Sequence, residues 1–308
     1  MPACWMPILG ALTVLDPVFI AQTIVSGIGI GCVFGLIGIG YCVIYNASGI
    51  VNFAQGAFVM LGGMITHALL TRAGLPLFVS AVIAIVLVAG LGVLVERLVV
   101  RPLWRRNATP FVMILATLAA QIVLERATLL VAGDQPKTLP NFIDLPPLML
   151  GRVAVSYQLM AIAVTSLVLV GLLGLFFSRT RVGRAMRACS INREAAALQG
   201  IPVSRMLAYA FALSAGLGAI AGVLITPTQF TAFNVGVSFA ISGFIAAIVG
   251  GFGNPAGAFI GGIVLGLAQS IAIVAFGSSF KNIAALSLLL VFITIRPMGL
   301  FGKTATGK

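Results

Sequence analysis

The sequence predicts an all-α fold: a polytopic membrane bundle of about 8–10 transmembrane helices, one or two of them broken or re-entrant, in a single domain over residues 1–308. Three observations predict it. Hydrophobic residues make up 60% of the 308 residues and charged residues 8%, against about 25% charged in soluble domains. The mean hydropathy is +1.17, and apolar segments of helix length recur along the chain. This composition excludes a soluble globular domain, a disordered chain and a disulfide-rich secreted module.

Nine apolar segments are expected to cross the bilayer, because a helix needs about 20 apolar residues to span the hydrocarbon core. The segment 239–252 is short for this purpose. In order, the nine are residues 19–43, 54–71, 76–95, 110–131, 158–177, 206–225, 239–252, 257–276 and 282–295.

The formal charge of +12 would suggest nucleic acid as a partner of a soluble protein. Here 13 of the 18 basic residues fall in 96–109, 178–205 and 296–308. Even numbers of spans separate these clusters, so all three, including the C-terminus, are expected in the cytoplasm. Three spans precede the first cluster, so residues 1–17 are expected outside the cell. The loop 132–157, whose net charge is zero, is expected on the same side. A further break inside the first segment would reverse the N-terminal side.

The four cysteines do not form the spacing of a disulfide framework. Cys4 lies at the N-terminus, Cys32 and Cys42 lie in an apolar run, and Cys189 lies in an arginine-rich loop. We expect free thiols. Residues 1–17 carry no Lys or Arg, so no cleaved signal peptide is expected.

Glycines repeat at four-residue spacing within several of the expected spans. Small residues one turn apart let helix backbones approach closely in lipid. The spacing is compatible with static bundle packing and with surfaces that slide during a conformational cycle. The residues concerned are Gly27, Gly31, Gly35, Gly218, Gly222, Gly257, Gly261, Gly262 and Gly266.

Two segments interrupt the helical pattern, residues 46–56 and residues 250–257, one in each half of the chain. Interrupted helices in corresponding halves point to a transport site near the midplane of the membrane. Irregular backbone survives there only when it is buried in protein or lines a cavity. The alternative is that both breaks are loops at the cytoplasmic surface. The amides expected to line a substrate pathway are Asn46, Asn52, Gln55 and Asn254.

The residues expected of a metalloenzyme or a nucleotide-binding protein are missing from the sequence. His67 is the single histidine, and no His, Cys or carboxylate cluster has metal-ligand spacing. We expect His67 to be a packed or hydrogen-bonded residue near the outer interface. The ending Gly302-Lys303-Thr304 is no P-loop, because position 297 is Pro and no strand precedes it. We therefore expect no metal, no cofactor and no enzymatic activity.

Carboxylates are scarce, and only Glu125 of the six falls inside an expected span. We expect Glu125 to lie with Arg126 near the outer interface. Ion-coupled transporters keep ionisable residues within the membrane to carry the coupling. The scarcity therefore argues against an ion-coupled secondary transporter, as the missing catalytic constellations argue against a membrane-embedded enzyme. The scarcity of intramembrane carboxylates favours a transporter that takes its energy from a partner protein.

The basic loop 178–205 contains a segment that predicts a short cytoplasmic helix. Ser190 or Asn192 can cap its start, and Glu194 suits the first turn. The alanines that follow have high helix propensity, and Gly200 supplies a left-handed stop. An isolated helix of two turns is marginal in water, so docking into a partner would stabilise it.

Glu194-Ala195-Ala196, with Gly200 following, resembles the EAA coupling motif of bacterial ABC-importer permeases. More specifically, the chain resembles the LivH-type permeases of branched-chain amino acid ABC transporters. The match covers nearly the whole chain. It rests on residues 49–56, 187–200, 211–216, 246–258 and 296–302, in that order. Gln55 departs from the family, in which His is common at this position, so no proton role is expected there.

The resemblance implies a bacterial inner-membrane subunit that forms the translocation pathway and is driven by two cytoplasmic ABC ATPases. It also implies a second homologous permease as a different chain, and a periplasmic or lipid-anchored amino-acid binding protein. The substrates would be branched-chain or related apolar amino acids, with urea, short amides or sugars as alternatives. The residues implied in ATPase coupling are Arg187, Asn192, Glu194, Ala195, Ala196 and Gly200. The alternative for this loop is a basic segment that only sets orientation.

Overall fold

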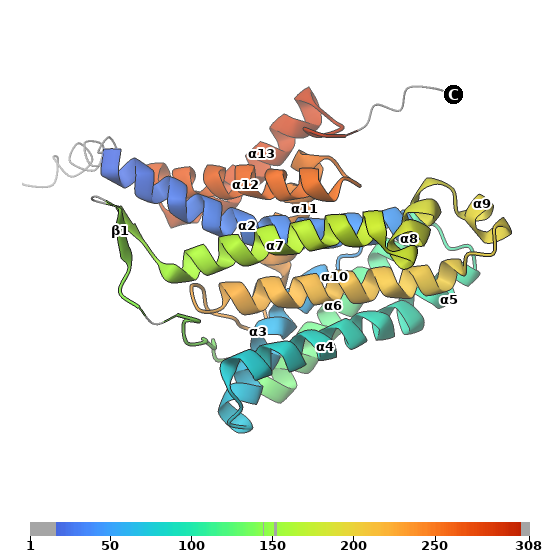
Figure 1. Cartoon of the computed structure of the whole chain (residues 1–308), viewed down its shortest axis with the longest axis horizontal. Coiled ribbons are helices and arrows are strands. Elements are labelled where there is room, and N and C mark those ends of the chain that lie inside the picture. Colours follow the sequence, from blue (N-terminus) through green and yellow to red (C-terminus); the bar gives the residue numbers. More distant parts are fainter. Residues whose placement is uncertain (1–16, 144, 151–152, 303–308) are drawn as a thin grey trace, which may run out of the picture.

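The computed structural model describes residues 17–143, 145–150 and 153–302, and most of these residues are helical (Figure 1). The longer helices are α2 (Pro17–Ser48), α3 (Gln55–Arg72), α4 (Leu77–Val95), α6 (Pro110–Ala132), α7 (Tyr157–Arg179), α10 (Val203–Ile225), α11 (Val235–Gly250), α12 (Pro255–Phe276) and α13 (Lys281–Ile295). The shorter elements are the π-helix η1 (Glu96–Val100), α5 (Arg101–Arg105), α8 (Arg181–Ile191), α9 (Arg193–Leu198) and the 3₁₀ helix η2 (Ser278–Phe280).

Each of the nine expected spans coincides with a helix, which confirms the polytopic all-α prediction. Within the described ranges, seven helices are long and apolar enough to cross a membrane: Pro17–Ser48, Leu77–Arg105, Pro110–Ala132, Tyr157–Arg179, Val203–Ile225, Pro255–Phe276 and Ser278–Ile295. The helices α3 and α11 account for the difference. At 16 residues α11 is too short, and α3 is not among the seven.

The two ends of the bundle differ (Figure 1). One end carries α5, α8 and α9, and we call it the basic end. The opposite end carries strands β1 (Leu148–Leu150) and β2 (Val153–Val155), which pair antiparallel, and we call it the hairpin end. Helices α2 and α7 both run from the hairpin end to the basic end, and α10 runs back.

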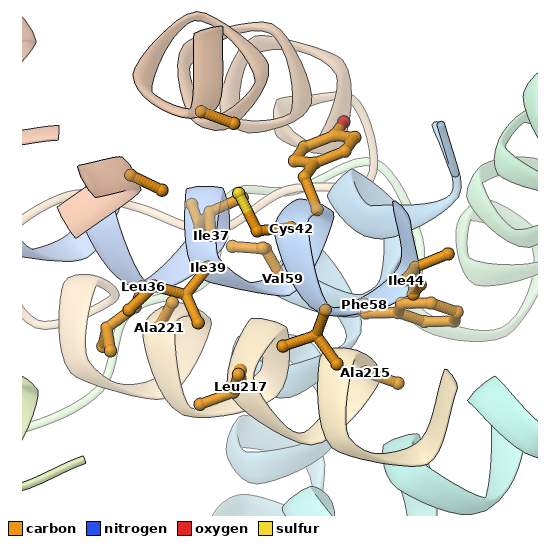
Figure 2. Close-up of a cluster of buried hydrophobic side chains, with 14 of the residues drawn as sticks. Leu36, Ile37, Ile39, Cys42, Ile44, Phe58, Val59, Ala215, Leu217 and Ala221 are labelled. Carbon is orange, nitrogen blue, oxygen red and sulfur yellow. The ribbon is translucent and has the colours of Figure 1, made fainter. Parts of the chain in front are cut away.

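Helix α2 is the centre of the bundle. Every residue from Gly31 to Ile44 is buried, because α2 is packed on several sides by α10, α11 and α12. A helix that is apolar all round is typical of such a position. In contrast, α7 and α13 expose most of their apolar residues, as lipid-facing helices do. Figure 2 shows the centre, with labelled side chains Leu36, Ile37, Ile39, Cys42, Ile44, Phe58, Val59, Ala215, Leu217 and Ala221.

The glycine repeats mark the closest helix contacts. A Cβ placed on Gly31 of α2 would lie 2.7 Å from the Cα of Ile263 on α12. A Cβ on Gly222 of α10 would collide with the carbonyl of Val59 on α3. These glycines therefore lie where neighbouring helices are in close contact. Gly171, on the outer face of α7, has no atom within 4 Å of such a Cβ.

The two basic loops are more helical than the sequence indicated. The chain of α4 continues through η1 into α5, and in this stretch the fully buried Glu96 pairs with Arg101 at 2.9 Å. The segment before Asn192 forms α8, which buries Gly183, Met186 and Cys189 against the bundle. Its arginines lie on the opposite, exposed face, so α8 is an amphipathic helix. The arginine-rich sequence of this segment suggested a loop instead.

Several predictions concern single residues. Cys32, Cys42 and Cys189 are free thiols, as predicted, and all three are buried. His67 lies at the hairpin end with Nδ1 2.9 Å from the carbonyl oxygen of Thr138, in agreement with a hydrogen-bonded residue. The predictions for Cys4 and for the ending at residues 303–308 lie outside the described residues.

Candidate functional site

The connection between α2 and α3 turns back into the bundle. It starts at the exposed Gly49, and by Asn52 the side chain is only 1% exposed. Gln55, the first residue of α3, is fully buried and donates from Nε2 to the carbonyl of Ser214 at 3.0 Å. The hydroxyl of Ser214 donates to Oε1 of Gln55 at 2.6 Å. Because Ser214 lies at the midpoint of α10, α3 begins in the middle of the bundle.

Helix α6 supplies the acceptors for the start of α3. The first N–H groups of a helix have no partner within it. Thr117 Oγ1 accepts from the N–H of Phe53 at 3.2 Å, and Gln121 Oε1 accepts from the N–H of Ala57 at 2.6 Å. A helix can therefore begin at this buried position without leaving its donors unpaired.

Asn52 shapes the turn into α3. Its Oδ1 accepts from the N–H of Ala54 at 3.1 Å, which forms an Asx turn. Its Nδ2 is buried and has no hydrogen-bond partner among the described residues. A buried amide nitrogen without a partner is costly, and such groups are often found at functional positions.

Glu125 faces the interior of the bundle, which corrects the expectation that it lies with Arg126. Its Oε1 accepts from Gln121 Nε2 at 2.7 Å, whereas Arg126 is exposed. Among the described residues the one ion pair is Arg101 with Glu96. Successive residues of an α-helix are rotated by about 100°, so neighbours in sequence point to different faces.

Helix α11 begins at the same level of the bundle. A Cβ on Gly236 would lie 2.7 Å from Gln121 Nε2 and 3.1 Å from the carbonyl of Gly56. From here α3 runs to the hairpin end and α11 runs to the basic end. Two short helices with opposite directions thus begin side by side near Gln121, the midpoint of α6. Both present the positive ends of their dipoles there, beside the buried Glu125.

The second interruption lies elsewhere, at the basic end of the bundle. Asn46 Nδ2 donates to the carbonyl of Gly253 at 2.8 Å, which joins this turn to the end of α2. Asn254 caps α12 by accepting from the N–H of Gly257 at 3.2 Å. The second break is therefore a turn at the end of the bundle, which agrees with the alternative interpretation for this break and not for the first. The partner of the first break is instead the connection 226–234, which leads into α11.

An aromatic cluster packs the space between the two breaks, and the sequence reasoning did not identify it. Its ring centroids are separated by 4.6 to 6.2 Å, mostly in edge-to-face geometry. The rings come from α2, from the turn before α3, from α11 and from the second break. The cluster consists of Tyr41, Tyr45, Phe53, Phe244 and Phe252.

The predicted short helix is present as α9, at the basic end. Asn192 Oδ1 accepts from the N–H of Ala195 at 3.0 Å, so Asn192 is the cap rather than Ser190. Gly200 has φ of +78°, which confirms the left-handed stop. Burial raises the pKa of the Cys189 thiol, which anchors the preceding helix α8.

Helix α9 projects from the bundle (Figure 1). Ala196 is buried, whereas Glu194 and Ala195 on the neighbouring faces are exposed. Leu198 of α9 is 88% exposed, and Ile191, the last residue of α8, is 82% exposed. Uncovered apolar side chains on a projecting helix are typical of a surface that a partner covers.

Arg193, the first residue of α9, was not among the predicted site residues. Its guanidinium carbon lies 5.6 Å from the ring centroid of Trp104, and a Cβ on Gly49 would lie 2.6 Å from its Nη2. Burial lowers the pKa of Arg193. These three residues are far apart in sequence, and no spacing rule connects them.

The sequence of this chain is similar to those of known transport proteins along most of its length. The family model described as branched-chain amino acid transport system / permease component matches residues 23–295. The chain is 34% identical over 302 residues to the high-affinity branched-chain amino acid transport system permease protein BraD of Pseudomonas aeruginosa, which covers 93% of this chain and 97% of that protein. It is 29% identical to the corresponding LivH of Escherichia coli K12, which covers 94% and 98%.

A solved structure shares the fold. PsaBC from Streptococcus pneumoniae in complex with Fab aligns with a TM-score of 0.52 at 14% identity, over 96% of this chain and 98% of that chain. At this identity the similarity concerns the fold alone.

Proposed function

Because this chain belongs to the branched-chain amino acid transport system permease component family, we propose that it carries branched-chain or related apolar amino acids across the bacterial inner membrane. The chain is a multi-pass, non-catalytic transport subunit, and its family implies an ATPase and a substrate-binding protein as partners. The observation that carries the proposal is the match to permease relatives along nearly the whole bundle.

In this proposal α9 is the helix that docks in the ATPase. Its capped start, its left-handed stop and its exposed Leu198 support this role. Ala196 and the half-buried Arg193 hold α9 against the bundle, and the other residues of α9 are exposed. The residues proposed for coupling are Arg187, Asn192, Glu194, Ala195, Ala196 and Gly200.

The proposed pathway runs past the starts of α3 and α11. Helix N-termini favour a carboxylate, which every amino acid carries. Asn52 Nδ2 is a buried donor that has no hydrogen-bond partner within the described part of the chain. Gln55 holds the start of α3, while Asn46 and Asn254 hold the turn at the basic end. Because the backbones of Gly56 and Gly236 touch in this conformation, passage of a solute requires α3 and α11 to separate.

The proposed assembly contains two ATPases, a second permease of the same family as a different chain, and a periplasmic or lipid-anchored binding protein. In this arrangement the basic end, with α8 and α9, faces the cytoplasm, and the C-terminus is proposed on the same side of the membrane, since basic residues are retained there.

Uptake by the complete transporter in proteoliposomes tests the function. We expect ATP-dependent accumulation of labelled leucine that excess isoleucine or valine suppresses and that fructose or urea does not. Accumulation without ATP that collapses with the proton gradient would contradict the proposal.

The role of α9 is tested in the same system. Glu194→Lys should reduce leucine uptake at least tenfold, because it places a positive charge at the positive end of the helix and on the docking face. The matched control is Asp134→Lys, which makes the same change of charge in an exposed loop at the hairpin end. Membrane insertion should be normal in both variants. Equal uptake by the two variants would remove the coupling assignment.

A further inference from the structure

We propose that Arg193 is the positioning residue that links α9 to the re-entrant turn between α2 and α3, so that movement of α9 reaches the start of α3 in the middle of the bundle. The proposal rests on the proposed function, in which an ATPase moves α9. It adds a contact between the docking helix and the solute pathway.

The first step is the contact itself, which joins three elements. Arg193 belongs to α9, Trp104 to α5 and Gly49 to the turn after α2. The guanidinium carbon is 5.6 Å from the centroid of the Trp104 ring, within the range of a cation–π contact. Arg193 is half-buried and takes no part in the one ion pair of the described residues. The contacts of this side chain are therefore with an aromatic face and with the backbone of the turn, and not with a carboxylate.

The second step is the fit between the guanidinium and Gly49. Gly49 has φ of +65°, in the left-handed region that favours glycine. A Cβ there would lie 2.6 Å from Arg193 Nη2, so even an alanine would displace the guanidinium. The turn and the side chain thus occupy complementary space.

The third step is the short connection from the turn to the pathway. Asn52 follows Gly49 by three residues, and α3 begins at Gln55. Hydrogen bonds pin both ends of this connection: Gly49 donates to the carbonyl of Tyr45 at 2.6 Å, and Phe53 donates to Thr117 at 3.2 Å. Because this segment is short and hydrogen-bonded at both ends, it cannot absorb a displacement by itself. A displacement at Gly49 therefore moves the start of α3.

The chemistry of arginine is specific to this role. The planar guanidinium stacks on an aromatic ring and covers a backbone turn at the same time, whereas the ammonium of lysine is a compact and strongly hydrated charge. Replacement by lysine keeps the charge and loses the geometry.

The experiment compares Arg193→Lys with the matched control Arg184→Lys, an exposed arginine of α8, in the complete transporter. Leucine uptake and ATP hydrolysis are measured together in proteoliposomes. For Arg193→Lys we expect ATP hydrolysis within about twofold of the unmodified transporter, and leucine transported per ATP lowered about three- to tenfold, as for loss of a half-buried cation–π contact. The control should preserve both quantities.

Trp104 and Gly49 provide independent checks. Trp104→Phe keeps a ring face and should retain transport per ATP, whereas Trp104→Leu should lower it. The double variant of Arg193→Lys with Trp104→Leu should transport as much leucine per ATP as the more impaired single variant, because both substitutions remove the same contact. Gly49→Ala should lower transport per ATP in the same way.

Two results would overturn the proposal. One is unchanged transport per ATP in Arg193→Lys. The other is a parallel loss of uptake and ATP hydrolysis, which would place Arg193 in ATPase docking. Failure of the unmodified transporter to accumulate leucine on ATP would instead contradict the proposed function, so the two failures are distinguishable.

Discussion

Gln121 is the residue on which the middle of the bundle depends most directly. It accepts from the start of α3 through Oε1 and donates to Glu125 through Nε2. Both partners are buried, so removal of this amide leaves an unpaired donor and an unpaired carboxylate. Unsatisfied buried groups cost far more than a hydrogen bond contributes on formation.

We therefore expect Gln121→Leu to lower the free energy of unfolding by about 2–4 kcal/mol, from one unpaired amide and one unpaired carboxylate. Thermal unfolding of the purified protein in detergent measures the change. The control is Thr128→Val on the same helix, since the Thr128 hydroxyl bonds only to the carbonyl of Leu124 in its own helix. Equal stability of the two variants would show that α6 does not support the start of α3.

At the residue scale, local chemistry was predictable and long-range contacts were not. The cap at Asn192 and the stop at Gly200 follow from rules that connect residues a few positions apart. The orientation of Glu125 depends on which face of α6 meets the bundle, and the prediction for it was wrong. The contact of Arg193 with Trp104 joins two loops that only the folded bundle brings together.

Among the elements, α2 and α12 pack closely, because glycines remove the side chains between them. Valine at Gly31 would force its Cβ to 2.7 Å from the backbone of Ile263, which cannot yield without moving α12. Overpacking of this kind costs about 1–3 kcal/mol.

Gly31→Val is thus expected to lower the melting temperature in detergent and to reduce the yield of folded protein. Gly171→Val on α7 is the matched control, because nothing lies within 4 Å of a Cβ there. Size-exclusion profiles with thermal scans report both effects. A Gly31→Val protein as stable as the control would mean that α2 and α12 are not in close contact.

Hydropathy located the long helices well, since each must place about 20 apolar residues in the bilayer. It marked the segment of α11 as short, but it did not show that α3 and α11 start inside the bundle. Their starts are defined by partners on α6, and those partners lie more than 60 residues from either break in the sequence. The amphipathic helix α8 was missed because dense arginines suggested a loop.

On the scale of the whole molecule, the two ends of the bundle differ in composition and in the elements that they carry. The basic end carries the projecting α9, and the hairpin end carries β1 and β2 (Figure 1). Between them, two short helices begin side by side and run to opposite ends. Contact of α9 with the turn before α3 gives the bundle a direct route from one end to its middle.

The proposed orientation predicts which end of the bundle is accessible from outside the cell. Leu145 and Ile191 are 58% and 82% exposed at the hairpin and basic ends, and the cysteines of the described residues are buried. In a Cys4→Ser background, an impermeant maleimide added to intact spheroplasts should label Leu145→Cys and spare Ile191→Cys. Inside-out vesicles should give the reverse pattern. Labelling of Ile191→Cys in spheroplasts would place α9 outside the cell, where no ATPase could reach it, and would contradict both the orientation and the docking role.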